Sequence, residues 1–218
     1  MKQCVMIVLG VILVLWLIKI SEIILGLDLA VYGIYPRDMD KLTGVITAPL
    51  IHGSFEHLFA NTLPLFIMGS ALIYNYPKAV KYVIPIIYLG SGVGVWLFAR
   101  ESYHIGASGV AHGMMFFIFI AGILRNDKPS AALALIIFFL YGGMLVSIFP
   151  TQAHISFESH FFGAVAGTIC AFLFRDMDPK KAEKKYSWEL EEEDLLEFPD
   201  DDNEEKSKLV HDTKYSAY

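Results

Sequence analysis

The stretch GASGVAHGMMFFIFIAGIL occupies residues 106–124, where a glycine-rich start leads into an uninterrupted apolar run. From Ser108 to Leu124 this run has 17 residues, so an α-helix made of it would be about 26 Å long at 1.5 Å per residue. The hydrocarbon core of a bilayer is about 30 Å thick. A helix this short would leave Ser108 below the membrane surface. The irregular backbone before Ser108 must then line a wet cavity, because peptide groups exposed to lipid cannot be satisfied.

Apolar stretches also lie on both sides of this run. Of the 218 residues, 55% are hydrophobic and only 18% are charged, a composition typical of membrane proteins. Polar segments that contain proline separate neighbouring stretches, as at residues 75–78. The sequence therefore predicts an all-α membrane protein with six transmembrane helices and a short fourth helix, over residues 4–25, 57–76, 79–99, 108–124, 130–149 and 159–175.

The distribution of charge predicts two domains. Residues 1–175 hold ten Lys or Arg and eight Asp or Glu, whereas residues 176–218 hold seven and fifteen. We expect residues 1–175 to form the six-helix membrane domain. Residues 176–218 lack an apolar run that could build a core, so we expect a charged, disordered tail in the aqueous phase.

Basic residues orient the predicted bundle. Under six spans, one side carries Lys2, Lys78, Lys81, Arg125, Lys128, Arg175 and the lysines at 180, 181, 184 and 185. The positive-inside rule then places both termini in the cytoplasm, at the inner membrane if the source is bacterial. The first apolar run continues past Trp16 without a small-residue cleavage site, so we expect a retained helix rather than a signal peptide.

Two features near the predicted outer surface complete the topology. Residues 26–56 form a long first external loop, whose apolar character favours a position in the membrane interface. Lys19 and Glu22 lie near one end of the first helix, and we expect their long side chains to reach the interface.

Polar side chains inside membrane spans are functional candidates, and here they gather near the outer ends of three helices. His57 and Asn61 are four residues apart on the second span, so they share a helix face. Ser108 begins the fourth span and is followed by His112, and His160 lies near the start of the sixth. The sequence therefore predicts one polar site where these three helices meet.

Small residues on two of these helices explain how they could meet. Pairs of glycines four residues apart, which let helix backbones approach closely in lipid, are Gly109 and Gly113 on the fourth span and Gly163 and Gly167 on the sixth. Ser108 and His160 lie just outside these pairs on the same side of the membrane. We therefore expect them within hydrogen-bond reach of each other.

A serine beside a histidine is the arrangement in which a base takes the hydroxyl proton while the oxygen attacks a carbonyl. Such chemistry also needs donors for the developing oxyanion. The Ser108 N–H is unpaired at a helix start, where the helix dipole favours negative charge. His57 and Asn61 supply further donors, and Gly106 permits a tight entry to the helix.

These residues occur in three motifs, in order on the second, fourth and sixth spans: His52-x4-His57-x3-Asn61, Gly106-x-Ser108-Gly109 and His160-x2-Gly163-x3-Gly167. Together they resemble the rhomboid family in its basic six-helix form, over residues 4–175. The resemblance implies an intramembrane serine protease that cleaves transmembrane segments of other membrane proteins near their outer ends. It implies no metal or cofactor. Membrane-protein substrates and the lipid bilayer are the expected partners, and nucleic acid is not.

The resemblance also implies a role for each site residue. Ser108 would be the nucleophile and His160 the base, without a third acidic member. His57, Asn61 and the Ser108 N–H would form the oxyanion hole, with His52 as a supporting residue. Gly106 and Gly109 flank the nucleophile and would support it as part of the same motif.

The sequence departs from the family pattern at two places. Many members carry a tyrosine four residues after the serine, stacked on the base; here that residue is His112, which is either a neighbour of the site or a core residue. Bacterial members often have Trp-Arg in the first loop, where this chain has Thr43-Gly44. The second departure leaves the anchoring of the loop open.

Other interpretations of the polar residues remain. A catalytically inactive rhomboid-like protein would bind transmembrane helices without cutting them. A zinc site is a competing interpretation, in which the ligands would be His52, His57, His112 and His160. No HExxH pattern is present. A channel or transporter would show internal repeats. Outside the site, we expect solvated side chains at His104, His154, Glu56 and Glu158.

Overall fold

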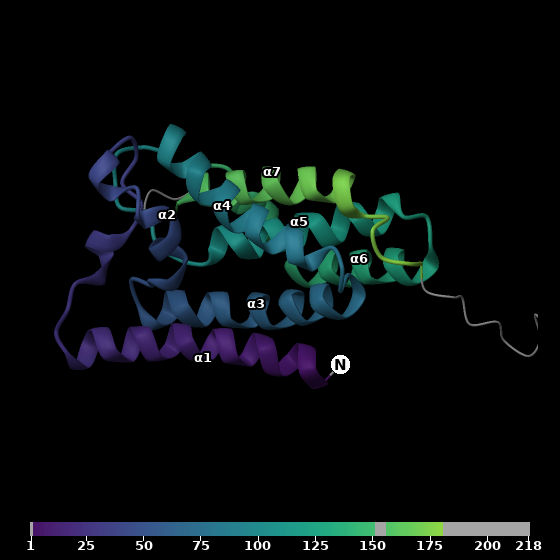
Figure 1. Ribbon diagram of the computed structural model, residues 1–218, viewed down its shortest axis with the longest axis horizontal. Helices are drawn as coiled ribbons and strands as arrows, with labels where there is room; N and C mark the ends of the chain where they lie inside the picture. Colours follow the sequence, from purple (N-terminus) through teal and green to yellow (C-terminus); the bar gives the residue numbers. More distant parts are fainter. Residues whose placement is uncertain (1, 151–155, 181–218) are drawn as a thin grey trace, which may run out of the picture. The chain divides into compact units, whose positions relative to one another are not determined.

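The computed structural model describes residues 2–150 and 156–180. Within these ranges the regular secondary structure is helical, and the one β-bridge is isolated, between Ile34 and His104. Figure 1 shows the long helices lying side by side. The α-helices are α1 (Lys2–Ile24), α2 (Gly44–Thr47), α3 (Phe55–Asn75), α4 (Val80–Phe98), α5 (Ser108–Leu124), α6 (Lys128–Tyr141) and α7 (Phe157–Phe174). The 3-10 helices are η1 (Leu29–Tyr32), η2 (Met39–Lys41), η3 (Ala48–Leu50) and η4 (Gly142–Ile148).

Five helical segments in the described part are long and apolar enough to cross a membrane: Lys2–Ile24, Phe55–Asn75, Val80–Phe98, Lys128–Ile148 and Phe157–Phe174. The sixth apolar helix, α5, is shorter, with 17 residues. Large apolar side chains cover the outside of the helices, and Phe139 on α6 is 81% exposed. Such a surface fits lipid rather than water. The predicted all-helical, multi-pass membrane class is confirmed.

The predicted helix boundaries agree with the structure except in one segment. The predicted helix 108–124 coincides with α5, and the limits of α1, α3, α4 and α7 differ from the prediction by one or two residues at each end. The predicted span 130–149 corresponds to the helical segment Lys128–Ile148, but the second half of this segment is not α-helical. There α6 ends at Tyr141, and the chain continues as the 3-10 helix η4.

Helix α5 is the centre of the bundle. It packs against α3, α4, α6 and α7, and eleven of its 17 residues are buried. In contrast, α1 packs mainly along α3, and Figure 1 shows the two helices lying along each other. The first residue of α5 is therefore surrounded by protein on several sides, although the helix itself is apolar.

The segment between α1 and α3 is a chain of short helices rather than an irregular loop. Hydrogen bonds between side chains and main-chain carbonyls anchor it to the end of α4. The Arg37 side chain donates to the Ala99 carbonyl at 2.8 Å, and the Trp96 side chain donates to the Asp38 carbonyl at 3.0 Å. At Gly44 a Cβ would collide with the Gly33 backbone, so only glycine fits. The loop is thus anchored although Thr43-Gly44 stand where the resemblance leads us to expect Trp-Arg.

Candidate active site

Ser108 and His160 come together at the N-terminal ends of two packed helices. Ser108 is the first residue of α5 and His160 the fourth of α7. The His160 Nε2 atom lies 2.9 Å from Ser108 Oγ. His160 is buried, and Ser108 is half-buried. This geometry allows the serine hydroxyl to donate its proton to the imidazole.

Backbone contact between α5 and α7 makes this distance possible. A Cβ on Gly163 would collide with the Gly109 carbonyl, and one on Gly167 would collide with the Gly113 carbonyl. The helix backbones therefore touch over two turns, as small-residue pairs allow in membranes. Nucleophile and base candidates are held together by glycines on both helices.

The second ring nitrogen of His160 faces a main-chain carbonyl. Its Nδ1 atom lies 3.0 Å from the Ser147 oxygen. A carbonyl oxygen accepts hydrogen bonds and cannot donate them, so Nδ1 carries the proton and donates it. Nε2 is then left with the lone pair that faces Ser108, which is the tautomer that a general base needs. No sequence signal pointed to Ser147, which lies in an apolar run near the end of η4.

His112 lies against the base as a buried neighbour. Its ring is stacked on that of His160, with centroids 3.9 Å apart and planes 10° from parallel. Its Nδ1 donates to the Ser108 carbonyl at 2.7 Å, and its Nε2 lies 2.9 Å from Ser147 Oγ. The two possibilities left open by the sequence are thus both met, because His112 is buried and also contacts the site.

The loop before Ser108 is held by His52 and by a strained glycine. His52 is 1% exposed, and its Nε2 accepts the Ala107 N–H at a long 3.5 Å. Burial, together with neighbouring His57, lowers the pKa of His52 to about 4, so the ring is neutral near pH 7. Gly106 has φ +109°, where side chains are strained, and a Cβ there would meet the His57 ring at 2.6 Å.

His57 and Asn61 lie on the first turns of α3. The Ser54 hydroxyl caps this helix by accepting the His57 N–H at 3.0 Å. The His57 ring packs on Gly106 and edge-to-face on the His52 ring. Asn61 is buried, and its amide donates to the His57 carbonyl at 3.1 Å. An amide NH₂ has two protons, so this bond engages only one of them.

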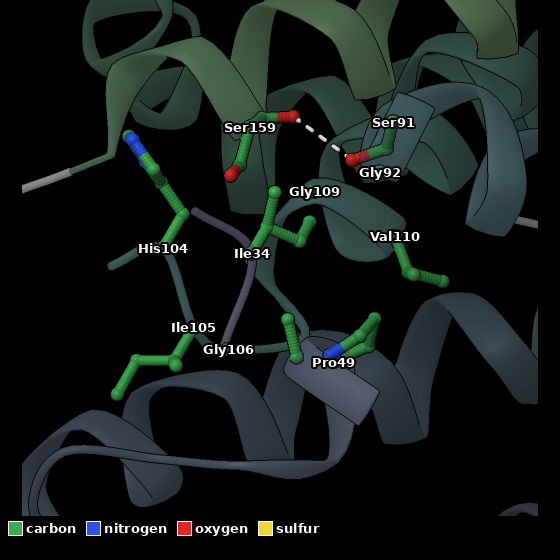
Figure 2. Close-up of a pocket in the computed structure, with 11 residues that line it drawn as sticks. Ile34, Pro49, Ser91, Gly92, His104, Ile105, Gly106, Gly109, Val110 and Ser159 are labelled. Carbon is green, nitrogen blue, oxygen red and sulfur yellow. Dashed lines mark hydrogen bonds between the residues drawn. The ribbon is translucent and has the colours of Figure 1, made fainter. Parts of the chain in front are cut away.

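A small cavity is lined by residues from the loop before α5 and from several helices, as Figure 2 shows. Its volume is about 10 Å³, the lower limit for one water molecule. Gly106 and Gly109 line one side, and the Ser91 hydroxyl donates to the Ser159 carbonyl beside it at 3.3 Å.

His104 is not the solvated loop residue that the sequence suggested. It is 2% exposed, and burial lowers its pKa. Its Nε2 faces the Arg100 carbonyl at 3.0 Å, and its Nδ1 lies 2.6 Å from the hydroxyl of Ser156, the N-cap of α7. His104 therefore ties the loop before Ser108 to the helix that carries His160. The corresponding expectation for His154 falls outside the described residues.

Two acidic residues were expected to be solvated, and one of them is buried. Glu56 is exposed as predicted, whereas Glu158 is 6% exposed in the first turn of α7. Its carboxylate lies 3.4 Å from the Arg100 N–H and 3.6 Å from Arg100 Nε. The prediction failed because the sequence does not show that α7 begins against the end of α4.

Lys19, predicted to reach the membrane interface, packs against protein. It is 7% exposed, and its ammonium donates to Glu22 at 2.8 Å and to the Gly53 carbonyl at 3.2 Å. Gly53 stands next to His52 in the chain. A buried charge is stable only when it is paired, so this pair fixes α1 to the segment that carries the histidines of α3.

The four histidines considered as zinc ligands contact other protein groups. His52 faces a main-chain N–H, His57 packs on Gly106, and the nitrogens of His112 and His160 face serine and carbonyl oxygens. Across residues 2–150 and 156–180, no three His, Cys, Asp or Glu side chains are grouped so that they could hold a metal ion.

Comparison with known proteins identifies the family of this chain. The profile of the Rhomboid domain family matches residues 39–177, which include every candidate site residue. The chain belongs to the rhomboid family, as its motifs predicted. A multi-pass membrane protein with apolar helices fits this membership.

Curated relatives extend over most of the chain. An uncharacterized protein of Mycobacterium tuberculosis is 33% identical over 168 residues, 73% of this chain and 70% of its own length. An uncharacterized protein of Mycobacterium leprae is 26% identical over 168 residues, 73% of this chain and 66% of its own. A Bacillus subtilis protein named "Putative rhomboid protease YdcA" is 28% identical over 148 residues, 65% of this chain and 70% of its own.

Proposed function

We propose that this protein is an intramembrane serine protease that hydrolyses peptide bonds in or near transmembrane segments of other membrane proteins. The observation that carries the proposal is the 2.9 Å distance between His160 Nε2 and Ser108 Oγ at the adjoining ends of α7 and α5. Membership of the rhomboid family supports it, as does the name of the Bacillus subtilis relative.

The proposed reaction proceeds through an acyl-enzyme. His160 Nε2 takes the hydroxyl proton as Ser108 Oγ attacks the scissile carbonyl carbon. The protonated imidazole then gives this proton to the leaving amine as the peptide C–N bond breaks. A water molecule, deprotonated by the same nitrogen, cleaves the ester and regenerates Ser108. No metal or cofactor takes part.

Three donors are proposed for the oxyanion that forms in each step. The Ser108 N–H stands at the start of a 17-residue helix, where it has no intrahelical partner and the helix dipole is positive. Asn61 contributes its second amide proton and His57 its imidazole N–H. Donors that are fixed in place before the reaction stabilise the transition state without reorganisation.

The membrane topology is part of the proposal. Counting α5 as a sixth span places both termini on the same side, and the basic residues there make that side cytoplasmic. Ser108 then lies near the opposite, outer surface. Substrates would therefore be cut near the outer ends of their transmembrane segments, and the protein would act in the inner membrane if its source is bacterial.

The test uses purified protein in detergent with a model transmembrane substrate. We expect cleavage by the wild type and none by Ser108→Ala or His160→Ala. Thr168→Ala serves as the matched control, because Thr168 lies on α7 two turns beyond His160 and its hydroxyl bonds only its own helix, at Ala164. Cleavage that persists in Ser108→Ala contradicts the mechanism. A protein that binds the substrate helix but never cleaves it would be an inactive rhomboid-like protein instead.

A further inference from the structure

Among residues 2–150 and 156–180 the proposed base has no carboxylate partner, and another group is placed to fix its tautomer. In a serine–histidine–aspartate triad the acid holds the Nδ1–H of the histidine and orients the ring. Here the Ser147 carbonyl occupies that place, 3.0 Å from His160 Nδ1. A carbonyl oxygen does not titrate between pH 4 and 10, and its dipole still stabilises the imidazolium that forms when Nε2 takes a proton.

The Ser147 carbonyl is useful only if its own segment is fixed. Ser147 lies in η4, a 3-10 helix of seven residues, and 3-10 helices longer than three or four residues are uncommon because their hydrogen bonds are poor. The Ser147 hydroxyl lies 2.7 Å from the Met144 carbonyl within this helix, and its single proton can serve only one acceptor at a time. It also lies 2.9 Å from His112 Nε2.

His112 connects this segment to the nucleophile. Its Nδ1 donates to the Ser108 carbonyl at 2.7 Å, so its Nε2 is an acceptor and takes the proton of the Ser147 hydroxyl at 2.9 Å. The Met144 carbonyl, 3.2 Å from Nε2, is a neighbour and not a hydrogen-bond partner in this tautomer. The ring is 3% exposed and stacked on His160. One imidazole thus joins the first turn of α5 to η4 along the face of the base.

We propose that His112 and Ser147 are positioning residues of the general base. His112 holds Ser147 through its hydroxyl, and Ser147 holds the His160 Nδ1–H through its carbonyl. The inference rests on the proposed function, because it assigns a role relative to the Ser108–His160 pair. A side chain that only stacks on His160 would lack the link to η4, so the hydrogen bonds of His112 carry the proposal.

The first test replaces the hydroxyl of Ser147 while keeping its carbonyl. Ser147→Ala should lower kcat about tenfold, a part of the ~10²- to 10⁴-fold that a general base contributes, with KM unchanged. Ser147→Thr retains a hydroxyl and should restore most of kcat. The rate of Ser108 labelling by a fluorophosphonate should follow kcat, because labelling needs the same activated hydroxyl but no peptide substrate. Thr168→Ala is the control for loss of a hydroxyl.

The second test separates stacking from hydrogen bonding at His112. His112→Phe keeps an aromatic ring on His160 and removes both hydrogen bonds, so kcat should fall about as far as in Ser147→Ala. The double variant should be no slower than the slower single variant, because both substitutions break one link. Should either single variant fail to fold, the other still tests the link.

The outcomes separate this inference from the proposed function. If the wild-type protein neither cleaves the model substrate nor is labelled at Ser108, the proposed Ser108–His160 dyad and the proposed function are both contradicted. The positioning proposal is overturned if the wild type is active and Ser147→Ala matches it in kcat and labelling rate. It is equally overturned if Ser147→Thr is as slow as Ser147→Ala at an unchanged Tm, or if the two single variants lower kcat additively.

Discussion

At the scale of single residues, the candidate site depends on main-chain contacts as much as on side chains. The base faces the Ser147 carbonyl, His112 faces the Ser108 carbonyl, and His52 faces the Ala107 N–H. Such contacts carry no sequence signature, since any residue offers the same main-chain groups. This explains why the motifs predicted which side chains meet at the site but not the atoms that orient them.

Gly106 is the position where a single added methyl group should do most harm. A Cβ there would meet the His57 ring at 2.6 Å, and φ is +109°. Gly106→Ala should therefore lower stability by about 1–3 kcal/mol and displace a proposed oxyanion donor, with at least a tenfold lower rate of Ser108 labelling. Gly10→Ala is the matched control, because nothing lies within 4 Å of a Cβ at Gly10. Equal labelling rates and equal Tm in both variants would contradict this account of the loop.

His52 should make stability depend on pH. Its pKa is about 4 in the folded protein and about 6.5 when exposed. Above pH 6.5 both states are neutral at this residue. Between pH 6.5 and 4 only the unfolded state is protonated, so stability should fall with falling pH, by about 3 kcal/mol in total. Unfolding in detergent, followed against pH, should show a weaker fall in His52→Gln. An unchanged slope in that variant would contradict the burial-driven shift.

At the scale of elements, the contact between α5 and α7 decides whether a site exists. Both helices expose glycines to each other, and their N-terminal ends carry Ser108 and His160. This arrangement was predictable, because a four-residue glycine spacing has one main structural use in membranes. The break between α6 and η4 was not predictable, because residues 130–149 are uniformly apolar and composition alone does not distinguish an α-helix from a 3-10 helix.

Substitution of Gly167 tests the contact between α5 and α7 at a position away from the Ser108–His160 pair. Gly167 lies seven residues beyond His160, where a Cβ would collide with the Gly113 carbonyl. Gly167→Ala should lower the free energy of unfolding by about 1–3 kcal/mol and slow Ser108 labelling, because the two helices must separate. Thermal unfolding in detergent measures the first effect and fluorophosphonate kinetics the second. If Gly167→Ala is as stable and as reactive as Gly10→Ala, the backbone contact does not position the dyad.

At the scale of the whole molecule, contacts between distant parts of the chain decided where prediction failed. His104 and Glu158 were expected to be solvated, and both are buried; Lys19, expected to reach the membrane interface, is also buried within the protein. Their partners lie far away in sequence: Ser156 for His104, Arg100 for Glu158 and Gly53 for Lys19. A polar side chain in a loop or near a helix end is buried or solvated according to these partners. Local sequence pattern does not contain that information.

Asp178 provides a long-range contact that should affect stability alone. It is buried, and it accepts the N–H groups of Lys78 and Ala79 at 2.9 and 3.0 Å, just before α4 begins. Asp178→Ala leaves both donors unpaired, at a cost of about 1–3 kcal/mol. The Tm should fall while Ser108 labelling below the Tm stays unchanged. Asp176→Ala is the control, since Asp176 pairs with Arg175 at the surface. A Tm equal to that of the control would show that this contact contributes nothing.

The measurement that most directly tests the account is covalent labelling of the purified protein by a fluorophosphonate, followed by mass spectrometry. We predict one adduct per chain, mapped to Ser108, with no adduct in Ser108→Ala and at least a hundredfold slower reaction in His160→Ala. An intact wild-type protein that forms no adduct at Ser108, or one whose labelling rate does not change when His160 is removed, would contradict the central claim that His160 activates Ser108.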